Sequence, residues 1–242
     1  MRLNIKFSFD TLEIPINYNH ILQAIVLKLI NDETYQKFIH DVGFKYKNRN
    51  YKLYSFSRLN GNFKYNKEVK KIKFYDFAIF SITSINTEFM KYISKTLLFN
   101  NELYINNQKV VIEEISGEKN EFNTEYLRVK SLSPVVVYST FKDNNKNKTY
   151  YYTPYEEKFY KILKKNIIKK YSSYYNEEIN DKRLNIRHVK NLKEVVTNYK
   201  GFIIKGWMGE YELTGNPKLL NVALNTGLGS KNSMGYGFIE KI

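Results

Sequence analysis

The stretch Gly227-Leu-Gly-Ser-Lys-Asn-Ser-Met-Gly-Tyr-Gly-Phe238, near the carboxyl end of the chain, decides how the rest of the sequence is interpreted. Four of the eleven glycines lie in it, which indicates a backbone with positive φ angles that approaches another group closely. Neither G-x-G-x-x-G nor G-x-x-x-x-G-K-[ST] fits the glycine spacing, so this is not a common nucleotide-binding loop. The segment around Lys231 and Ser233 predicts exposed backbone N–H groups suited to a phosphate backbone. We call residues 227–238 the glycine-rich loop.

Outward from this loop, the apolar pattern predicts the same series of elements twice. The first series comprises a strand at 3–9, a helix at 19–31 with Asn19 as N-cap, strands at 51–58 and 71–84, a helix at 89–97 and a strand pair at 103–115. The second comprises a strand at 126–138, a polar loop at 142–148, a helix after a capping box at 153–156, strands at 184–189 and 201–213, a helix that opens at Asn216-Pro217 and a last strand at 237–242.

Each series has the order βαββαβ, which is the ferredoxin-like unit. The sequence therefore predicts an α+β fold of two tandem ferredoxin-like (RRM-like) domains, residues 1–120 and 121–242, with a boundary near Asn120. A chain of 242 residues can bury such cores without disulfides.

The glycine-rich loop also carries a resemblance to a known family. Its pattern G-x-G-x5-G-x-G-[aromatic] is similar to the signature loop of the repeat-associated RNA-binding superfamily, and within it to the CRISPR repeat-processing endoribonucleases, the Cas-six family. Further stretches that resemble this family are Tyr18-Asn-His-Ile-Leu-Gln23, Phe38-Ile-His-Asp-Val42, Lys52-Leu-Tyr-Ser-Phe56 and Leu132-Ser-Pro-Val135. Because they occur in order along nearly the whole chain, the likeness is more specific than that of the loop alone.

Composition limits the function in several ways. The formal charge of +15 indicates a polyanionic partner such as nucleic acid, although AT-rich codons, which favour Lys, Asn, Ile, Tyr and Phe, are an alternative origin. The absence of cysteine excludes disulfides, thiolate metal sites and cysteine nucleophiles, and it fits a reducing cytoplasm. No signal peptide and no apolar run of about 18 residues is found, so we expect a cytoplasmic protein that does not contact a membrane.

Of the three histidines, His40 is the main candidate for chemistry. The resemblance implies that it is the acid–base catalyst of RNA cleavage. Imidazole suits this task because its unperturbed pKa of about 6.5 lets it give or take a proton near neutral pH. From position alone, it would be an exposed histidine at a helix end. We expect His20, in the first turn of a helix, to be structural and His188 to be a surface residue. With so few ligands, the sequence predicts no metal and no cofactor.

Basic residues complete the predicted site. Lys52 matches the lysine at which the family's second strand begins, and its charge would stabilise the scissile phosphate. Lys45, Lys47 and Arg49 are candidate phosphate contacts or simply a solvated loop. The expected RNA-binding residues of the glycine-rich loop are Gly227, Gly229, Ser230, Lys231, Asn232, Ser233, Gly235 and Gly237.

One position departs from the family. Several members carry a tyrosine on the first helix that orients or activates the reacting 2′-hydroxyl, and this chain has Leu27 there. Lys28 on the same helix is the candidate replacement that we include among the catalytic residues. Tyr35, Tyr46 and Tyr51 are alternatives that the sequence leaves open.

The resemblance implies a metal-independent endoribonuclease that cuts CRISPR precursor transcripts within each repeat. Its partner would be CRISPR repeat RNA. An interference effector complex and a homodimer are further partners that stay open, as do the repeat sequence, its secondary structure and retention of the product. The alternative function is a non-catalytic RNA-binding subunit that carries guide RNA to such a complex. A domain that binds a small ligand or a protein is the third alternative.

Overall fold

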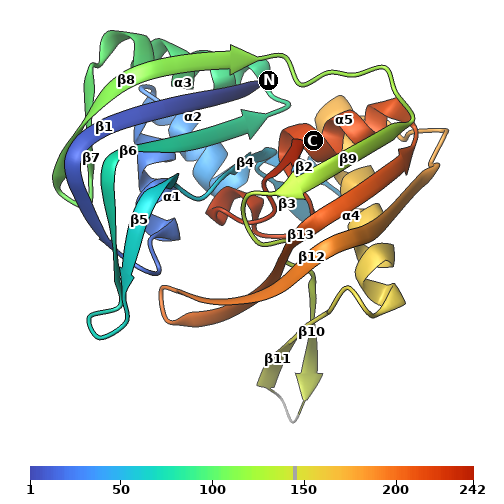
Figure 1. Ribbon diagram of the computed structural model, residues 1–242. Coiled ribbons are helices and arrows are strands. Elements are labelled where there is room, and N and C mark those ends of the chain that lie inside the picture. Colours follow the sequence, from blue (N-terminus) through green and yellow to red (C-terminus); the bar gives the residue numbers. More distant parts are fainter. Residues whose placement is uncertain (144–145) are drawn as a thin grey trace.

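The computed structural model describes residues 1–143 and 146–242. Its two larger sheets are antiparallel and lie side by side, each with helices against one face (Figure 1). Among the described residues, no helix is long and apolar enough to cross a membrane.

The first sheet has six strands in the order β4-β6-β1-β8-β7, with β5 paired to β6. Its strands are β1 (Arg2–Pro15), β4 (Tyr54–Phe56), β5 (Asn60–Asn66), β6 (Lys71–Ser84), β7 (Glu102–Ile105) and β8 (Gln108–Glu118). The helices are α1 (Asn19–Lys28), α2 (Glu33–Lys37), which continues into the π-helical turn η1 (Phe38–Val42), and α3 (Thr87–Phe99). The central strand β1 lies between β6 and β8, which is the ferredoxin-like arrangement.

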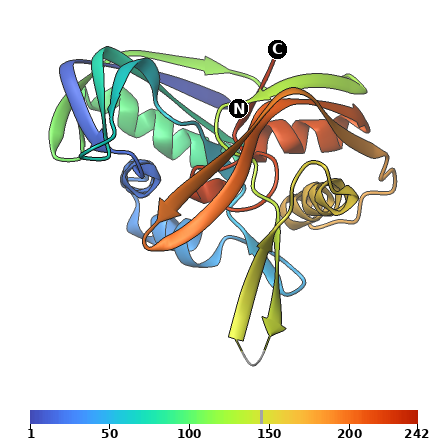
Figure 2. The ribbon, with the colours of Figure 1, turned by 60° about the horizontal axis from the view of Figure 1, so that its bottom comes forward.

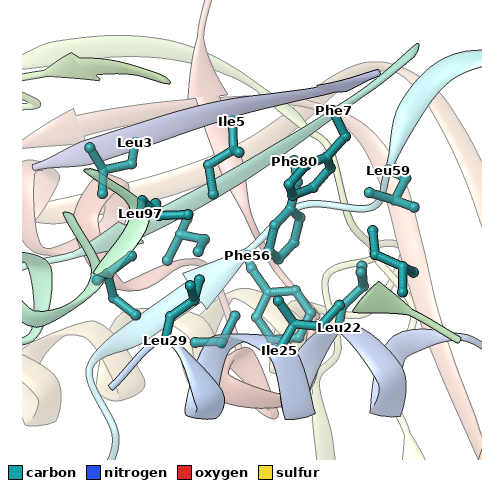
Figure 3. Packing of buried hydrophobic residues seen from close by; sticks show 14 of the residues in the cluster. Leu3, Ile5, Phe7, Leu22, Ile25, Leu29, Phe56, Leu59, Phe80 and Leu97 are labelled. Carbon is teal, nitrogen blue, oxygen red and sulfur yellow. The ribbon is translucent and has the colours of Figure 1, made fainter. Parts of the chain in front are cut away.

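Alternation along β1 builds the first core. Ile5 and Phe7 are fully buried on the face that meets α1, and polar residues separate them. Phe80 of β6 and Phe56 of β4 fill the space between this face and the helix (Figure 3). The expected strand therefore forms for the expected reason, the burial of every second side chain.

The second sheet has the order β12-β13-β9-β14, again with its first strand inside. The elements of this half are β9 (Tyr126–Ser131), α4 (Glu157–Tyr175), β12 (Leu184–Tyr199), β13 (Phe202–Gly215), α5 (Pro217–Thr226), the 3-10 turn η2 (Asn232–Met234) and β14 (Ile239–Lys241). The α+β prediction of tandem ferredoxin-like units is confirmed. The first sheet ends at Glu118 and the second begins at Tyr126, so the boundary proposed near Asn120 lies in the connecting segment.

Several predicted element limits are wrong. The strand expected at 126–138 ends at Ser131, because Pro134 has no N–H to donate and the chain leaves the sheet there. Val135 and Val136 then form isolated bridges with Trp207 and Gly229. The helix expected at 19–31 ends at Lys28.

The polar segment at 142–148 is not simply a loop. Its described residues belong to a hairpin of β10 (Tyr138–Asp143) and β11 (Lys146–Tyr151), and the remainder of the prediction lies outside the described residues. The hairpin projects from the body of the protein (Figure 2).

The basic segment at 45–49 also forms a hairpin, made of β2 (Phe44–Tyr46) and β3 (Arg49–Tyr51). This hairpin packs against α4 of the second half. The ring centroids of Phe44 and Tyr174 are 5.8 Å apart, and the Tyr46 hydroxyl donates to Glu178 at 2.5 Å. The two halves are thereby joined beside the glycine-rich loop.

Candidate functional site

The glycine-rich loop follows α5 and lies between the two halves (Figures 1 and 2). Gly227, Gly229, Gly235 and Gly237 all have positive φ, as the sequence predicted. A Cβ at Gly237 would lie 1.9 Å from the Leu228 carbonyl oxygen, and one at Gly229 would lie 2.4 Å from that of Val136. The close approach that requires glycine is therefore to the protein's own backbone.

These glycines are buried, so the loop exposes only its middle. The N–H groups of Leu228, Ser230 and Gly237 donate to carbonyl oxygens of the protein. Among the described residues, those of Lys231, Asn232 and Ser233 have no acceptor. The part of the loop that is free to receive an anion is the short segment that opens η2.

Side chains from both halves hold the loop. From the first half, the Asn19 amide donates to the carbonyl oxygens of Met234 and Gly235 at 3.1 and 3.0 Å, and the Ser55 hydroxyl donates to that of Tyr236 at 3.2 Å. Asn19 is the first residue of α1 rather than the N-cap that the sequence predicted, and its Nδ2 group donates to the loop. From the second half, the Lys170 ammonium reaches the carbonyl oxygen of Gly227 at 2.7 Å.

A cleft of about 680 Å³ opens beside the loop, between the β3–β4 segment and α4. We call it the basic cleft. Its basic lining residues are Arg49, Lys52, Lys158, Lys165, Lys169, Lys170 and Lys231. Residues 229–233 of the glycine-rich loop form one wall. The structure therefore brings the loop together with two of the predicted basic residues, Arg49 and Lys52.

Positive charge is crowded in the basic cleft. Burial, together with the nearby cations of Arg49, Lys165 and Lys47, lowers the pKa of Lys169. Burial also lowers the pKa of Lys231. Both shifts show that the charged form of the lysine is disfavoured in the cleft, so a bound anion would stabilise it.

Lys52 is a poorly compensated cation of the basic cleft. Its Nζ atom is buried and, among residues 1–143 and 146–242, has no hydrogen-bond partner. Burial lowers the pKa of Lys52, and only the carboxylate of Asp41 opposes this effect. An ammonium in such a position favours a phosphate ligand.

His40 lies on η1, one residue before Asp41. Its Nδ1 atom is 2.6 Å from Asp41 Oδ1, and its side chain is 58% exposed. The Lys52 stem passes beside the same turn, since a Cβ at Gly43 would meet its Cδ atom at 3.0 Å. His40 does not line the basic cleft, whereas Lys52 does. The carboxylate of Asp41 lies between them, since it contacts the His40 ring and its charge acts on the Lys52 ammonium.

The family described as CRISPR associated protein Cas6, C-terminal, matches residues 116–241, which is more than half of the chain. The chain belongs to the Cas6 family. The resemblance seen in the sequence is thereby confirmed.

Relatives extend the Cas6 likeness over the whole chain. A protein of Methanocaldococcus jannaschii named CRISPR-associated endoribonuclease Cas6 1 is 24% identical over 100% of this chain and 93% of its own length. CRISPR-associated endoribonuclease Cas6 of Pyrococcus furiosus is 23% identical over 94% of this chain and 83% of its own. A solved structure described as a Cas6-related gene product from Pyrococcus furiosus superposes with a TM-score of 0.87 at 23% identity, covering 100% of this chain and 98% of that one, and this likeness shows the shared fold.

Leu27 stands where several Cas6 proteins are expected to carry a tyrosine. Its side chain packs against the first core. Lys28 is exposed at the end of α1 and does not line the basic cleft. Three tyrosines were alternatives to Lys28 as the replacement for the absent helix tyrosine. The Tyr35 hydroxyl accepts a hydrogen bond from the Asn86 amide, and the Tyr46 hydroxyl donates one to Glu178. Tyr51 lines the basic cleft, and its buried hydroxyl has no partner among the described residues.

The remaining residues considered in the sequence analysis do not line the basic cleft. Lys45 and Lys47 are exposed on the β2–β3 hairpin. The ring Nδ1 of His20 is 3.0 Å from the Asn17 carbonyl oxygen, and that of His188 is 2.6 Å from the Tyr160 hydroxyl, so both engage the protein itself. Within the described chain, no three His, Asp or Glu side chains gather as a metal site requires.

The sequence interpretation missed the basic residues of α4. Lys158, Lys165 and Lys169 recur at spacings of seven and four residues, which places them on one face of a helix. This spacing was visible in the sequence. The sequence could not show that this face of the helix borders the glycine-rich loop, because that contact depends on how the two halves pack.

Proposed function

We propose that this Cas6 family member is a metal-independent endoribonuclease that cuts CRISPR precursor transcripts once within each repeat. The observation that carries the proposal is the buried Lys52 ammonium, which has no hydrogen-bond partner in the described part of the chain and lies in a basic cleft walled by the glycine-rich loop. The names of the Methanocaldococcus jannaschii and Pyrococcus furiosus relatives support the same activity.

In the proposed reaction, the ribose 2′-hydroxyl attacks the adjacent phosphorus and the 5′-oxygen of the next nucleotide leaves. The products carry a 2′,3′-cyclic phosphate and a 5′-hydroxyl. Much of the rate would come from holding the attacking and leaving oxygens in line, so that binding along the basic cleft contributes to catalysis.

The proposal gives each candidate residue a task. His40 transfers the proton, to the leaving oxygen or from the nucleophile, and Asp41 orients its ring through Nδ1. Lys52 stabilises the charge on the phosphorane. Tyr51 is favoured as the replacement for the absent helix tyrosine because it lines the basic cleft, whereas Lys28 is exposed outside it.

RNA binding is assigned to the basic cleft. Residues 229–233 of the loop and Arg49 line it, whereas Lys45 and Lys47 would extend the phosphate path along the β2–β3 hairpin. DNA should bind there but resist cleavage, since it lacks the attacking hydroxyl.

The test uses purified protein and a repeat RNA in EDTA. We expect one defined pair of fragments, and no cleavage of the same RNA with a 2′-deoxy substitution at the cut site. His40→Ala should reduce the single-turnover rate by about a hundredfold or more with repeat affinity near normal. His188→Ala, which removes a histidine outside the cleft, is the matched control. Full cleavage by His40→Ala would remove His40 from the mechanism.

The second candidate function is a non-catalytic subunit that carries guide RNA to an interference complex. The observation that favours it is the position of His40 outside the lining of the basic cleft. In that case the protein would bind the repeat RNA tightly in EDTA and leave it intact.

A further inference from the structure

Lys170 occupies a position where the helix pattern calls for an apolar side chain. It continues the buried stripe of Phe159, Leu163 and Ile167 on α4 and is 4% exposed. Burying an ammonium carries a large desolvation cost, so helix stability does not account for a lysine here. Its neighbour Lys169 also lines the basic cleft, but only Lys170 is buried.

Three acceptors surround the Lys170 ammonium. It donates to the Gly227 carbonyl oxygen at 2.7 Å, to Asn232 Oδ1 at 2.7 Å and to the Thr226 carbonyl oxygen at 3.2 Å. The three acceptors match the three donors of an ammonium group. The two carbonyls end α5, where a helix leaves its carbonyl oxygens unpaired and favours positive charge.

Asn232 connects Lys170 to the rest of the glycine-rich loop through its own hydrogen bonds. Its Nδ2 atom donates to the carbonyl oxygens of Leu228 and Tyr236, both at 3.0 Å. Lys170 and Asn232 therefore tie together the start, the middle and the end of the loop. Residues 231–233, whose N–H groups have no acceptor among the residues that the structure describes, lie between these contacts.

We propose that Lys170 is a positioning residue that, through Asn232, holds the glycine-rich loop in the conformation that binds RNA and does not contact RNA itself. The inference rests on the proposed function in taking the basic cleft as the RNA site. The Lys170 ammonium is buried and its three donors are used within the protein, so it has none left for a phosphate. Without it, the loop would have to be ordered at the moment of binding, which weakens affinity.

The first test needs no RNA. Lys170→Met removes the donors and keeps an apolar stem, and Lys169→Met is the matched control one residue away. We expect the amides of Leu228, Ser230 and Gly237 to exchange hydrogen about tenfold faster or more in Lys170→Met and at the wild-type rate in Lys169→Met. Wild-type exchange in Lys170→Met would overturn the proposal.

The second test measures the Kd for repeat RNA with a 2′-deoxy block as a function of salt. Lys170→Met should weaken binding about ten- to a hundredfold while the slope of log Kd against log salt stays at the wild-type value. Lys169→Met, which removes a cation that lines the cleft, should lower that slope by about 0.7. A lowered slope in Lys170→Met would mean a direct phosphate contact and would contradict a positioning role.

Cleavage separates positioning from chemistry. At saturating unblocked RNA, Lys170→Met should keep its single-turnover rate within about threefold of wild type, because the loop is then held by the bound RNA. A large loss at saturation would instead make Lys170 part of the reaction. If the wild-type protein neither binds nor cuts the repeat, the proposed function fails, while the exchange experiment still tests the loop contact.

Asn232→Ala covers the case in which Lys170→Met does not fold. It breaks the same connection from the loop side and should reproduce the faster exchange and the weaker binding at unchanged salt slope. Loss of the folded state in both variants would show a purely structural role and would also overturn the proposal.

Discussion

Two clefts border α4, and they differ in chemistry although their volumes are close, about 680 and 730 Å³. The basic cleft takes its α4 side chains from residues 158–170, where lysine recurs. The second, which we call the tyrosine cleft, takes Tyr171, Tyr174 and Tyr175 from the last turn of the helix. Its acidic lining residues are Glu118, Glu121 and Glu177.

The comparison bears on the origin of the +15 charge. If lysines were present only because of codon usage, both clefts would be expected to hold them equally. Instead the basic cleft gathers lysines beside a loop with free N–H groups, while the tyrosine cleft has Lys119 and Lys218 among three carboxylates. The uneven distribution supports the proposed binding of RNA in the basic cleft.

The largest expected difference between the clefts is in cleavage. Lys52→Met should lower the single-turnover rate of RNA cleavage by a factor of about 10² to 10³, because it removes the charge placed against the scissile phosphate. Lys218→Met, in the tyrosine cleft, should leave the rate at the wild-type value. Equal rates in the two variants, measured at saturating RNA, would remove the catalytic distinction between the clefts.

A smaller difference is expected in affinity. Lys165→Glu with Lys169→Glu in the basic cleft and Lys119→Glu with Lys218→Glu in the tyrosine cleft change the net charge of the protein equally. The first pair should weaken binding of blocked repeat RNA about a hundredfold, since it removes two phosphate contacts and adds repulsion, and the second pair by less than about threefold. Similar losses in fluorescence anisotropy titrations would mean that overall charge, rather than the basic cleft, attracts the RNA.

The smallest effect concerns Lys170, the residue at which α4 passes from one cleft to the other. Burial lowers its pKa to about 7 from 10.5. Between these pH values the unfolded chain binds more protons than the folded one, so the free energy of unfolding rises with pH, by at most about 1.4 kcal/mol per unit. Urea unfolding at pH 7.5 and 8.5 should show the wild type gaining about 1 kcal/mol relative to Lys170→Met. A constant difference between the two proteins would show that burial does not depress this pKa.

Much of the fold could be predicted because its signals are local. Alternation over residues 3–9, the Asn216-Pro217 helix start and the four loop glycines each specify a backbone conformation within a few residues. The early end of β9 has a local cause, Pro134, whereas two other errors lie where a segment contacts a distant part of the chain. The segment at 45–49 forms a hairpin that packs against α4. Asn19 lies inside α1, and its amide donates to Met234 and Gly235, more than two hundred residues away in sequence.

The candidate site was predicted less completely. His40, Lys52 and the loop were suggested by resemblance, but neither composition nor spacing could show that Lys52 would be buried without a partner. Lys169 and Lys170 are adjacent and chemically identical, and both line the basic cleft, yet only Lys170 is buried and donates to the glycine-rich loop. Only the rotation of α4 against the second core separates them.

By itself, the sequence determined the twofold βαββαβ series and the loop that only glycine can form, because side-chain periodicity and backbone sterics act between near neighbours. The tertiary structure decided which cations face one another, because the β3–β4 segment, α4 and the glycine-rich loop meet only when the two halves pack. Burial is a property of that packing. It leaves the Lys52 ammonium without a hydrogen-bond partner within residues 1–143 and 146–242, and it places the Lys170 ammonium against the carbonyl oxygens of the loop.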